Sequence, residues 1–271
     1  MIDYIIFGIL WVILSLLGEW GVQSIGDHLY LSVASAQAHE GQEAAAFILS
    51  ILTPIFVFVV LMLLFILFRY RNKSSDSSHA KLQVKNNKPY IAIWVAVSIL
   101  INVLLFIHPT DSAIQTMFMD EESQAKSAPN VLVVDVVARQ WEWQYSYPQY
   151  GLTQTVDKDG NDQIVLPVNT KIEFVLRSYD PAHTYDPAIG VIHSFWVPAF
   201  GIKEDVIPGE TRTEYITTTK ITNTKIDPMV RVQCAEVCGA GHPYMETPLS
   251  IVSGSDFQKW IAKEKKMQQG S

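Results

Sequence analysis

A long uncharged run, AAAFILSILTPIFVFVVLMLLFILF from Ala44 to Phe68, lies in the N-terminal third of the sequence. A helix rises about 1.5 Å per residue, so a run of about 25 residues is long enough to cross the hydrocarbon core of a bilayer. Buried helices of soluble proteins seldom need so long a stretch without charge. The sequence therefore predicts a membrane-spanning helix here.

Two further apolar runs flank this one. Tyr90 to Ile107 is an uncharged run of about 18 residues, at the short end of the spanning range. The run between Asp3 and Glu19 is shorter still and could be the core of a signal peptide, since ASAQA at 34–38 resembles a cleavage site. No basic residue precedes that run, so we expect a retained, short first membrane helix, which gives two or three transmembrane helices in all.

The orientation in the membrane follows from the loop between the second and third runs. Residues 69–88 carry six basic side chains against one acidic side chain, Asp76. Lys- and Arg-rich short loops stay in the cytoplasm, and the stretch from Glu19 to Glu43 has neither residue. We therefore expect a multi-pass protein of the inner (plasma) membrane, with its C-terminal part on the periplasmic, extracytoplasmic side.

The remainder of the chain changes character. From Asn130 to about Ser253, short β-rich runs alternate with turn signals such as DKDGND and IPGE, and no helical period separates them. This pattern is typical of an all-β sandwich or barrel. The final segment can start a helix at Ser255, with Phe257, Trp260 and Ile261 on one side. The expected organisation is a short helix and external loop (1–45), a transmembrane hairpin (46–109), a linker (110–128), an external β domain (129–253) and a C-terminal helix or tail (254–271).

Charge and motifs limit the function. The chain carries a formal net charge of −7, and acidic residues outnumber basic ones in the outer domain, which argues against binding of nucleic acid. An acidic outer face would attract a basic partner, although a merely solvated surface is an equally common explanation. The sequence has no glycine-rich phosphate loop and no haem-attachment motif.

The two cysteines of the chain stand close together in VQCAEVCGAGHPYMETP, residues 232–248. On the outer side of a membrane they could form a disulfide. However, Cys238, His242 and Met245 follow one another closely, and His193 lies upstream in the β-rich run VIHSFWVP. Two histidines, a cysteine and a weak methionine ligand make a blue-copper electron-transfer site.

Cys234 is surplus to a mononuclear site. Because thiolates can bridge metals, two cysteines and two histidines also allow a dinuclear copper centre. The thioether of Met245 and the backbone carbonyl of Glu236 would then be the remaining weak ligands. A mononuclear blue-copper membrane protein with an idle Cys234 remains the alternative.

Three motifs, HSFWVPAFGIKEDVIPG (193–209), CAEVCGAGHPYM (234–245) and RQWEWQY (139–145), resemble cytochrome c oxidase subunit II, the subunit that carries the CuA centre. The resemblance implies a cupredoxin-like Greek-key domain after the membrane helices. It implies a role as the electron-accepting subunit of a proton-pumping terminal oxidase, with oxygen chemistry in subunit I. The implied partners are subunit I with its haem and CuB, subunit III, membrane lipid, and cytochrome c or another electron donor.

The resemblance also assigns roles to residues. The implied ligands of the dinuclear copper are His193, Cys234, Cys238, His242, Met245 and the carbonyl of Glu236. The carboxylate of Glu236 would also face a magnesium ion at the interface with subunit I. Trp141 resembles the surface tryptophan that receives the electron from cytochrome c, whereas Trp143 and Tyr145 are expected to belong to an aromatic cluster in the core.

The sequence departs from the family at several places, and the additional N-terminal helix exceeds the two that the family usually has. The residue three before the ligand histidine is usually an aspartate and here is Gly190, so Asp180 or Asp186 could supply the missing charge. The glutamate that the family usually has three residues before Trp94 is replaced by Ile91. The resemblance therefore does not imply proton uptake through this chain. Subunit II of quinol oxidases lacks the cysteine pair that this sequence has. Nitrous oxide reductase has a propeller before its CuA domain, where this sequence has predicted membrane helices. Both families therefore resemble this sequence less well.

Overall fold

The computed structural model describes residues 2–29, 32–69, 87–107, 130–156, 160–180 and 190–269. These fall into two compact units, Met1–Leu29 with Glu43–Ile114, and Tyr30–Gln42 with Gln115–Ser271. The predicted linker 110–128, nearly all of the basic loop and the stretch 181–189 lie outside the described residues.

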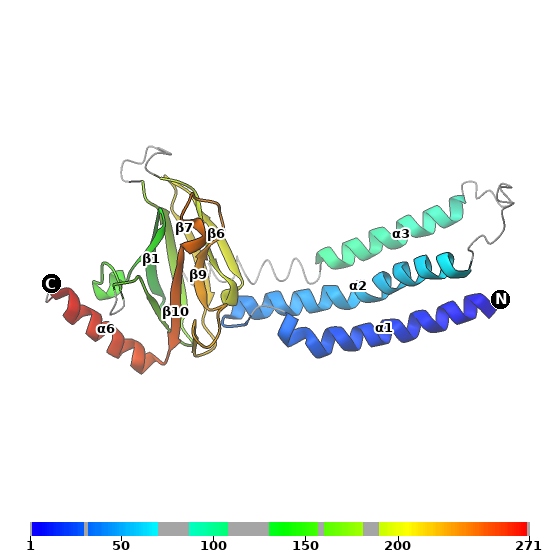
Figure 1. Cartoon of the computed structure of the whole chain (residues 1–271), viewed down its shortest axis with the longest axis horizontal. Coiled ribbons are helices and arrows are strands. Elements are labelled where there is room, and N and C mark those ends of the chain that lie inside the picture. The colour runs from blue at the N-terminus through cyan, green and yellow to red at the C-terminus, as the bar shows by residue number, and fades with distance from the viewer. Residues whose placement is uncertain are drawn as a thin grey trace. The chain divides into compact units, whose positions relative to one another are not determined.

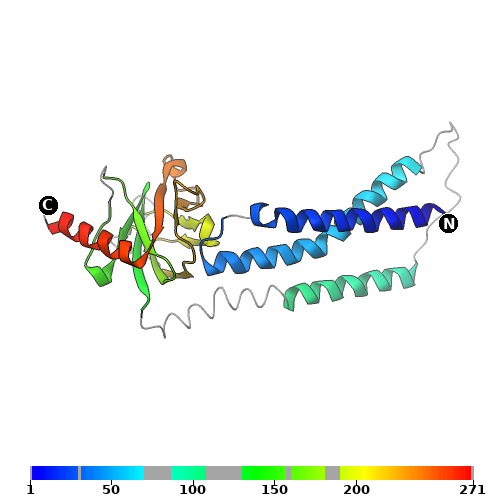
Figure 2. The ribbon, with the colours of Figure 1, turned by 90° about the horizontal axis from the view of Figure 1, so that it is seen from below.

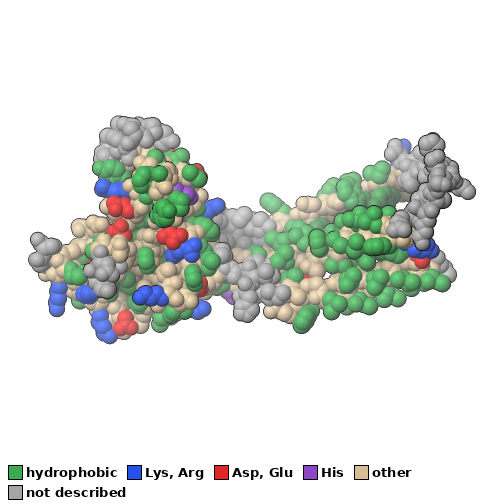
Figure 3. Space-filling view, in the orientation of Figure 1, with side chains coloured by type: hydrophobic (Ala, Val, Ile, Leu, Met, Phe, Trp, Pro, Cys, Tyr) green, Lys and Arg blue, Asp and Glu red, His purple; other side chains and the backbone are tan. Residues whose placement is uncertain are grey.

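The first unit is helical. Helices α1 (Ile2–Leu29), α2 (Ala36–Arg69) and α3 (Lys88–Leu105) are each long and apolar enough to cross a membrane. Apolar side chains cover the visible surface of these helices (Figure 3), as expected where lipid or other apolar surfaces replace water. Helix α1 is longer than the short helix that we expected, and α2 begins well before the uncharged run, so most of the expected external loop is helical.

Contacts between α1 and α2 include polar ones. The indole Nε1 of Trp11 donates to the carbonyl oxygen of Pro54 at 2.8 Å, and the Ser50 hydroxyl donates to Glu19 Oε1 at 2.6 Å. The rings of Trp11 and Phe58 meet edge to face. Pairing of polar groups between helices is what a low-dielectric surrounding demands, because unpaired ones are costly there.

The second unit is a sandwich of two β-sheets with one covering helix (Figures 1 and 2). Its strands are β1 (Leu132–Arg139), β2 (Glu142–Ser146), β3 (Ile164–Pro167), β4 (Lys171–Ser178), β5 (His193–Val197), β6 (Ile202–Val206), β7 (Arg212–Thr217), β8 (Thr222–Asn223), β9 (Arg231–Cys234) and β10 (Glu246–Val252). One sheet has the order β2-β1-β4-β7, and the other has β3-β10-β9-β5-β6 with β8 paired to β10. The predicted all-β sandwich is therefore confirmed.

Alternation of side chains builds the core between the sheets. In β4, Ile172, Phe174 and Leu176 are buried while the residues between them are partly exposed, and β1 repeats the pattern. A period of two places one face of each strand inside. Phe174 meets Phe195 of the opposite sheet with ring centroids 5.1 Å apart, which joins the two layers.

A strand at the edge of a sheet can lack a clear pattern in the sequence, as β6 shows. Its sequence IKEDV has apolar residues only at its ends, and Lys203 and Asp205 point to solvent. A strand at the edge of a sheet needs few apolar side chains, so its pattern resembles a loop.

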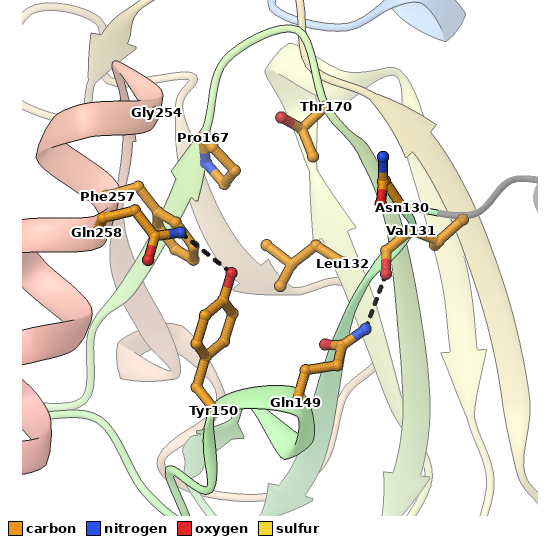
Figure 4. Close-up of a pocket in the computed structure, with 10 residues that line it drawn as sticks. All are labelled: Asn130, Val131, Leu132, Gln149, Tyr150, Pro167, Thr170, Gly254, Phe257 and Gln258. Atoms are coloured by element: carbon orange, nitrogen blue, oxygen red, sulfur yellow. Dashed lines mark hydrogen bonds between the residues drawn. The ribbon is translucent and has the colours of Figure 1, made fainter.

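Helix α6 (Gly254–Gln269) follows β10 and covers one end of the core. Phe257 and Ile261 are buried and Trp260 packs beside them, as the sequence predicted. Next to the start of α6 lies a pocket of about 420 Å³, in which Gln258 donates to the Tyr150 hydroxyl (Figure 4). This pocket lies at the end of β10 opposite to the cysteine loop.

The segment before α2 is part of the β unit. Ser35 is fully buried, and its hydroxyl donates to the carbonyl of Phe200 at 2.8 Å and accepts from the Ala38 N–H at 3.0 Å. Gln37, also buried, accepts from the Thr217 N–H at 3.1 Å. Ser35 is thus both the N-cap of α2 and an anchor on the sandwich.

Candidate metal centre

Two neighbouring strands and one loop bring the predicted ligands together. His193 begins β5, and Cys234 ends β9, its antiparallel neighbour, with Phe195 opposite Cys234 in the register. The other candidates follow in the loop that leads from β9 into β10. Sequence positions about forty residues apart therefore meet because β5 and β9 pair in one sheet.

The candidate donor atoms form a connected group. Cys234 Sγ lies 3.8 Å from His193 Nδ1, 3.8 Å from Cys238 Sγ and 3.1 Å from the carbonyl oxygen of Glu236. Cys238 Sγ lies 3.7 Å from His242 Nδ1 and 3.8 Å from Met245 Sδ. All six predicted donors thus converge, and both cysteines are free thiols. A disulfide has sulfurs about 2.05 Å apart, so this geometry does not contain one.

Backbone hydrogen bonds fix the ligand loop. The Cys234 N–H donates to the Met245 carbonyl at 3.1 Å, and the Ala235 N–H donates to the Ser194 carbonyl at 3.0 Å. Residues His242–Tyr244 form a single 3-10 turn that closes the loop. These bonds set the positions of the donors before any ion is present, which is the preorganisation that a metal site needs.

Burial shifts the pKa values of two candidate donors in opposite directions. Desolvation, with a smaller contribution from His242, lowers the pKa of His193 to about 4, so its imidazole is neutral at pH 7. Desolvation and the neighbouring Cys234 raise the pKa of the Cys238 thiol to about 12. A neutral imidazole is ready to bind a metal, whereas the thiol needs a cation to offset the charge of its ionised form.

Aromatic side chains form one wall of the site. Trp143 is fully buried, its ring centroid lies 6.0 Å from that of His193, and its Nε1 donates to the Met245 carbonyl at 3.3 Å. Tyr145 is also fully buried. Both residues are therefore core aromatics, as the sequence predicts, and Trp143 additionally packs against two of the candidate ligands.

Trp141, unlike Trp143 and Tyr145, is partly exposed to solvent. Its side chain is 41 % exposed, and its Nε1 donates to the Cys238 carbonyl at 3.1 Å. Gln140 donates from Nε2 to the same carbonyl at 2.8 Å. Sequence reasoning found Trp141 but missed Gln140, because nothing in the local pattern shows that the turn between β1 and β2 reaches the cysteine loop. Glu236 is exposed, so its carboxylate is accessible from outside this chain.

The structure shows the surroundings of Gly190 and Ile91, the two positions at which a residue differs from the family pattern. A Cβ at Gly190 would lie 2.7 Å from the Tyr179 carbonyl oxygen and 3.3 Å from Pro208 Cγ, so this position accepts only glycine. Asp180 is 7 % exposed and therefore is not part of an open acidic surface, and Asp186 lies outside the described residues. Ile91 on α3 is 46 % exposed among other apolar side chains.

Two family models match the chain. The periplasmic domain of cytochrome c oxidase subunit II matches residues 132–253, and the transmembrane domain of the same subunit matches residues 24–109. The chain belongs to the cytochrome c oxidase subunit II family. It is accordingly a membrane-anchored subunit of a terminal oxidase, an oxidoreductase, with a periplasmic-type domain. This membership confirms the family and the cupredoxin-like fold that the motifs predicted.

Two sequence relatives and one solved structure are similar to this chain. Cytochrome c oxidase subunit 2 of Thermostichus vulcanus is 27 % identical over 92 % of this chain and 82 % of its own length. The same subunit of Alkalihalophilus pseudofirmus is 30 % identical over 80 % of this chain. The matched region covers only 55 % of the length of that relative. The crystal structure of the periplasmic domain of subunit II (CoxB) of Bradyrhizobium japonicum covers 52 % of this chain and 97 % of its own, with 27 % identity and a TM-score of 0.43.

The donor set fits copper. Thiolate, thioether and imidazole are soft or borderline ligands, which favour copper over hard cations such as magnesium or calcium. The group is buried, since His193, Cys234 and Cys238 are each at most 9 % exposed. The arrangement can therefore hold copper in a water-poor setting.

Proposed function

We propose that this chain binds a dinuclear CuA centre and uses it to accept electrons one at a time from reduced cytochrome c or another donor. The electrons would continue to haem in subunit I, where oxygen is reduced and protons are pumped. The single observation that carries the proposal is the convergence of six soft and carbonyl donors around two free thiols. A mononuclear blue-copper site would need only one of those thiols.

The residues divide the binding of copper among themselves. Both thiolates, the two imidazoles of His193 and His242, the Met245 thioether and the Glu236 carbonyl would together hold the copper. The imidazole of His242 and the thioether of Met245 contact the Cys238 sulfur, and the imidazole of His193 and the Glu236 carbonyl contact the Cys234 sulfur. When bound, the centre supplies reversible one-electron redox chemistry.

The protein environment supports fast electron exchange. The wall of Trp143 and the backbone bonds of the loop hold the donors in one geometry, so little would have to rearrange when the charge changes. Trp141 would receive the electron, because it is exposed on one side and donates to the carbonyl of a ligand cysteine on the other. The exposed apolar side chains of Val237 and Tyr244 lie in the same loop and would contact a partner surface.

The proposal includes a membrane and partners. Three helices that can span a bilayer support a membrane location with contacts to lipid. The membrane that we propose is the inner membrane, and the partners that we propose within it are subunits I and III. The exposed carboxylate of Glu236 would be a ligand for magnesium at the interface with subunit I, since hard cations prefer oxygen ligands.

Replacement of one bridging sulfur tests the proposal. Cys234→Ser in the full-length chain should abolish the dinuclear spectrum, because serine is a poor bridging ligand for copper. The measurement is copper content together with electron paramagnetic resonance (EPR) after reconstitution. Glu236→Gln is the matched control, since it keeps the backbone carbonyl and should keep both copper ions. A native spectrum in Cys234→Ser would refute the dinuclear assignment and favour the mononuclear alternative.

A further inference from the structure

The turn that carries Trp141 rests directly on the cysteine loop. Gln140 and Trp141 connect β1 to β2, and both side chains donate to one acceptor, the Cys238 carbonyl, at 2.8 and 3.1 Å. Two donors on one carbonyl fix both the distance and the direction of approach of the indole. The turn is therefore locked to the backbone of a candidate copper ligand.

Two glycines lie beneath the indole. A Cβ at Gly241 would lie 2.5 Å from Trp141 Cγ and 2.7 Å from Cε3, and a Cβ at Gly239 would lie 3.1 Å from Cζ2 and Nε1. Carbon atoms normally approach to about 3.5–4.0 Å. The ring thus lies in the space that any larger residue at Gly241 would fill.

The backbone conformations of Gly239 and Gly241 show that the two positions require glycine for different reasons. Gly239 has φ +120°, which L-residues rarely adopt, so its own conformation already demands glycine. Gly241 has φ −87° and ψ 0°, which other residues can adopt. At Gly241, glycine is therefore required by the indole and not by the turn.

We propose that Gln140, Gly239 and Gly241 form an indole seat, which holds Trp141 against the Cys238 carbonyl and so positions it for electron transfer. These three are positioning residues for the role of Trp141, and the inference rests on the proposed function. One electron leaves the reduced donor and one arrives at the copper centre, and no bond or proton changes at the seat. A ring displaced by a Cβ would move by about 1 Å to regain normal contact and would lose its bond to the carbonyl.

The first test needs no metal. Paired full-length proteins with Trp141 and with Trp141→Phe isolate the fluorescence of this indole, in the native and in the Gly241→Ala background. Because Trp141 is 41 % exposed, release from the seat should raise its quenching by acrylamide about twofold. Gly254→Ala is the matched control, because a Cβ there meets nothing within 4 Å, and it should leave the quenching unchanged. Unchanged quenching in Gly241→Ala would overturn the proposal.

The second test uses the copper-loaded chain. Gly241→Ala should keep the dinuclear spectrum but slow reduction by cytochrome c several-fold, because the displaced indole loses its hydrogen bond to the carbonyl of a candidate ligand. Gln140→Leu removes one donor without crowding the ring and should slow reduction less. Native rates in both variants, or an equal loss in Gly254→Ala, would refute the seat. If the unsubstituted protein gave no dinuclear spectrum, the proposed function would be refuted. The quenching experiment on the metal-free protein would still test the indole seat.

Discussion

Glu214 offers a pH-dependent test of the sandwich. It lies in β7 opposite Phe174 of β4, in the alternation that places Ile216 in the core. Burial, and the nearby charge of Glu204, raise the pKa of Glu214 from 4.5 to about 7. The folded protein therefore prefers the neutral carboxylic acid, whereas the unfolded chain ionises at the ordinary pKa.

The direction of the effect follows from proton uptake on folding. Between pH 4.5 and 7 the folded state holds a proton that the unfolded state has released, so stability falls as pH rises through this window. Each pKa unit corresponds to about 1.4 kcal/mol, which sets a ceiling of about 3 kcal/mol. Because Glu214 is only partly buried, we expect about 1–2 kcal/mol in practice.

Glu214→Gln should remove this pH dependence. Glutamine resembles the protonated acid, so the variant should match the native protein near pH 5 and exceed it at pH 8 by about 3–6 °C in Tm. The assay is thermal unfolding of the metal-free, full-length chain, followed by tryptophan fluorescence at both pH values. Glu173→Gln makes the same change on the outer face of the sheet and should give no such gain. An equal Tm difference at both pH values would refute the reasoning.

Two further substitutions test other parts of the structure. Trp143→Phe should lower stability by about 1–3 kcal/mol in thermal unfolding, because it removes the hydrogen bond to the Met245 carbonyl and leaves a small cavity. It should also alter the copper EPR spectrum, because the indole packs against His193. An unaltered spectrum would show that the copper site does not depend on this aromatic side chain. Ser35→Ala should cost about 1–2 kcal/mol in thermal unfolding, because one hydroxyl caps α2 and bonds to Phe200; an unchanged Tm would mean that this anchor contributes nothing.

The sequence was sufficient for features with a local signature. The length of the run from Ala44 to Phe68 and its lack of charge indicate a membrane helix. The alternation of apolar and polar residues in β4 indicates a half-buried strand. The cysteine loop is similar, since Cys234, Cys238 and His242 are close in sequence and their chemistry narrows the choice of metal. The partner strand that supplies His193 could be guessed because it is itself β-rich.

Features that depend on distant contacts could not be predicted. Gln140 donates to a carbonyl 98 positions later, and no pattern in the turn reveals that approach. The role of Gly241 becomes visible only once Trp141 is placed above it. Ser35 lies in a stretch that resembles a cleavage site, yet in the fold it is buried against Phe200. In each case tertiary packing, and not local preference, decides what the residue does.

The central claim is that both cysteines serve one copper centre with two ions. The most direct measurement is the copper content of the purified full-length chain, combined with its EPR spectrum in the oxidised state. The account predicts two copper ions per chain and hyperfine splitting from an electron shared equally by two copper nuclei. One copper ion per chain, with splitting from a single nucleus, would contradict it.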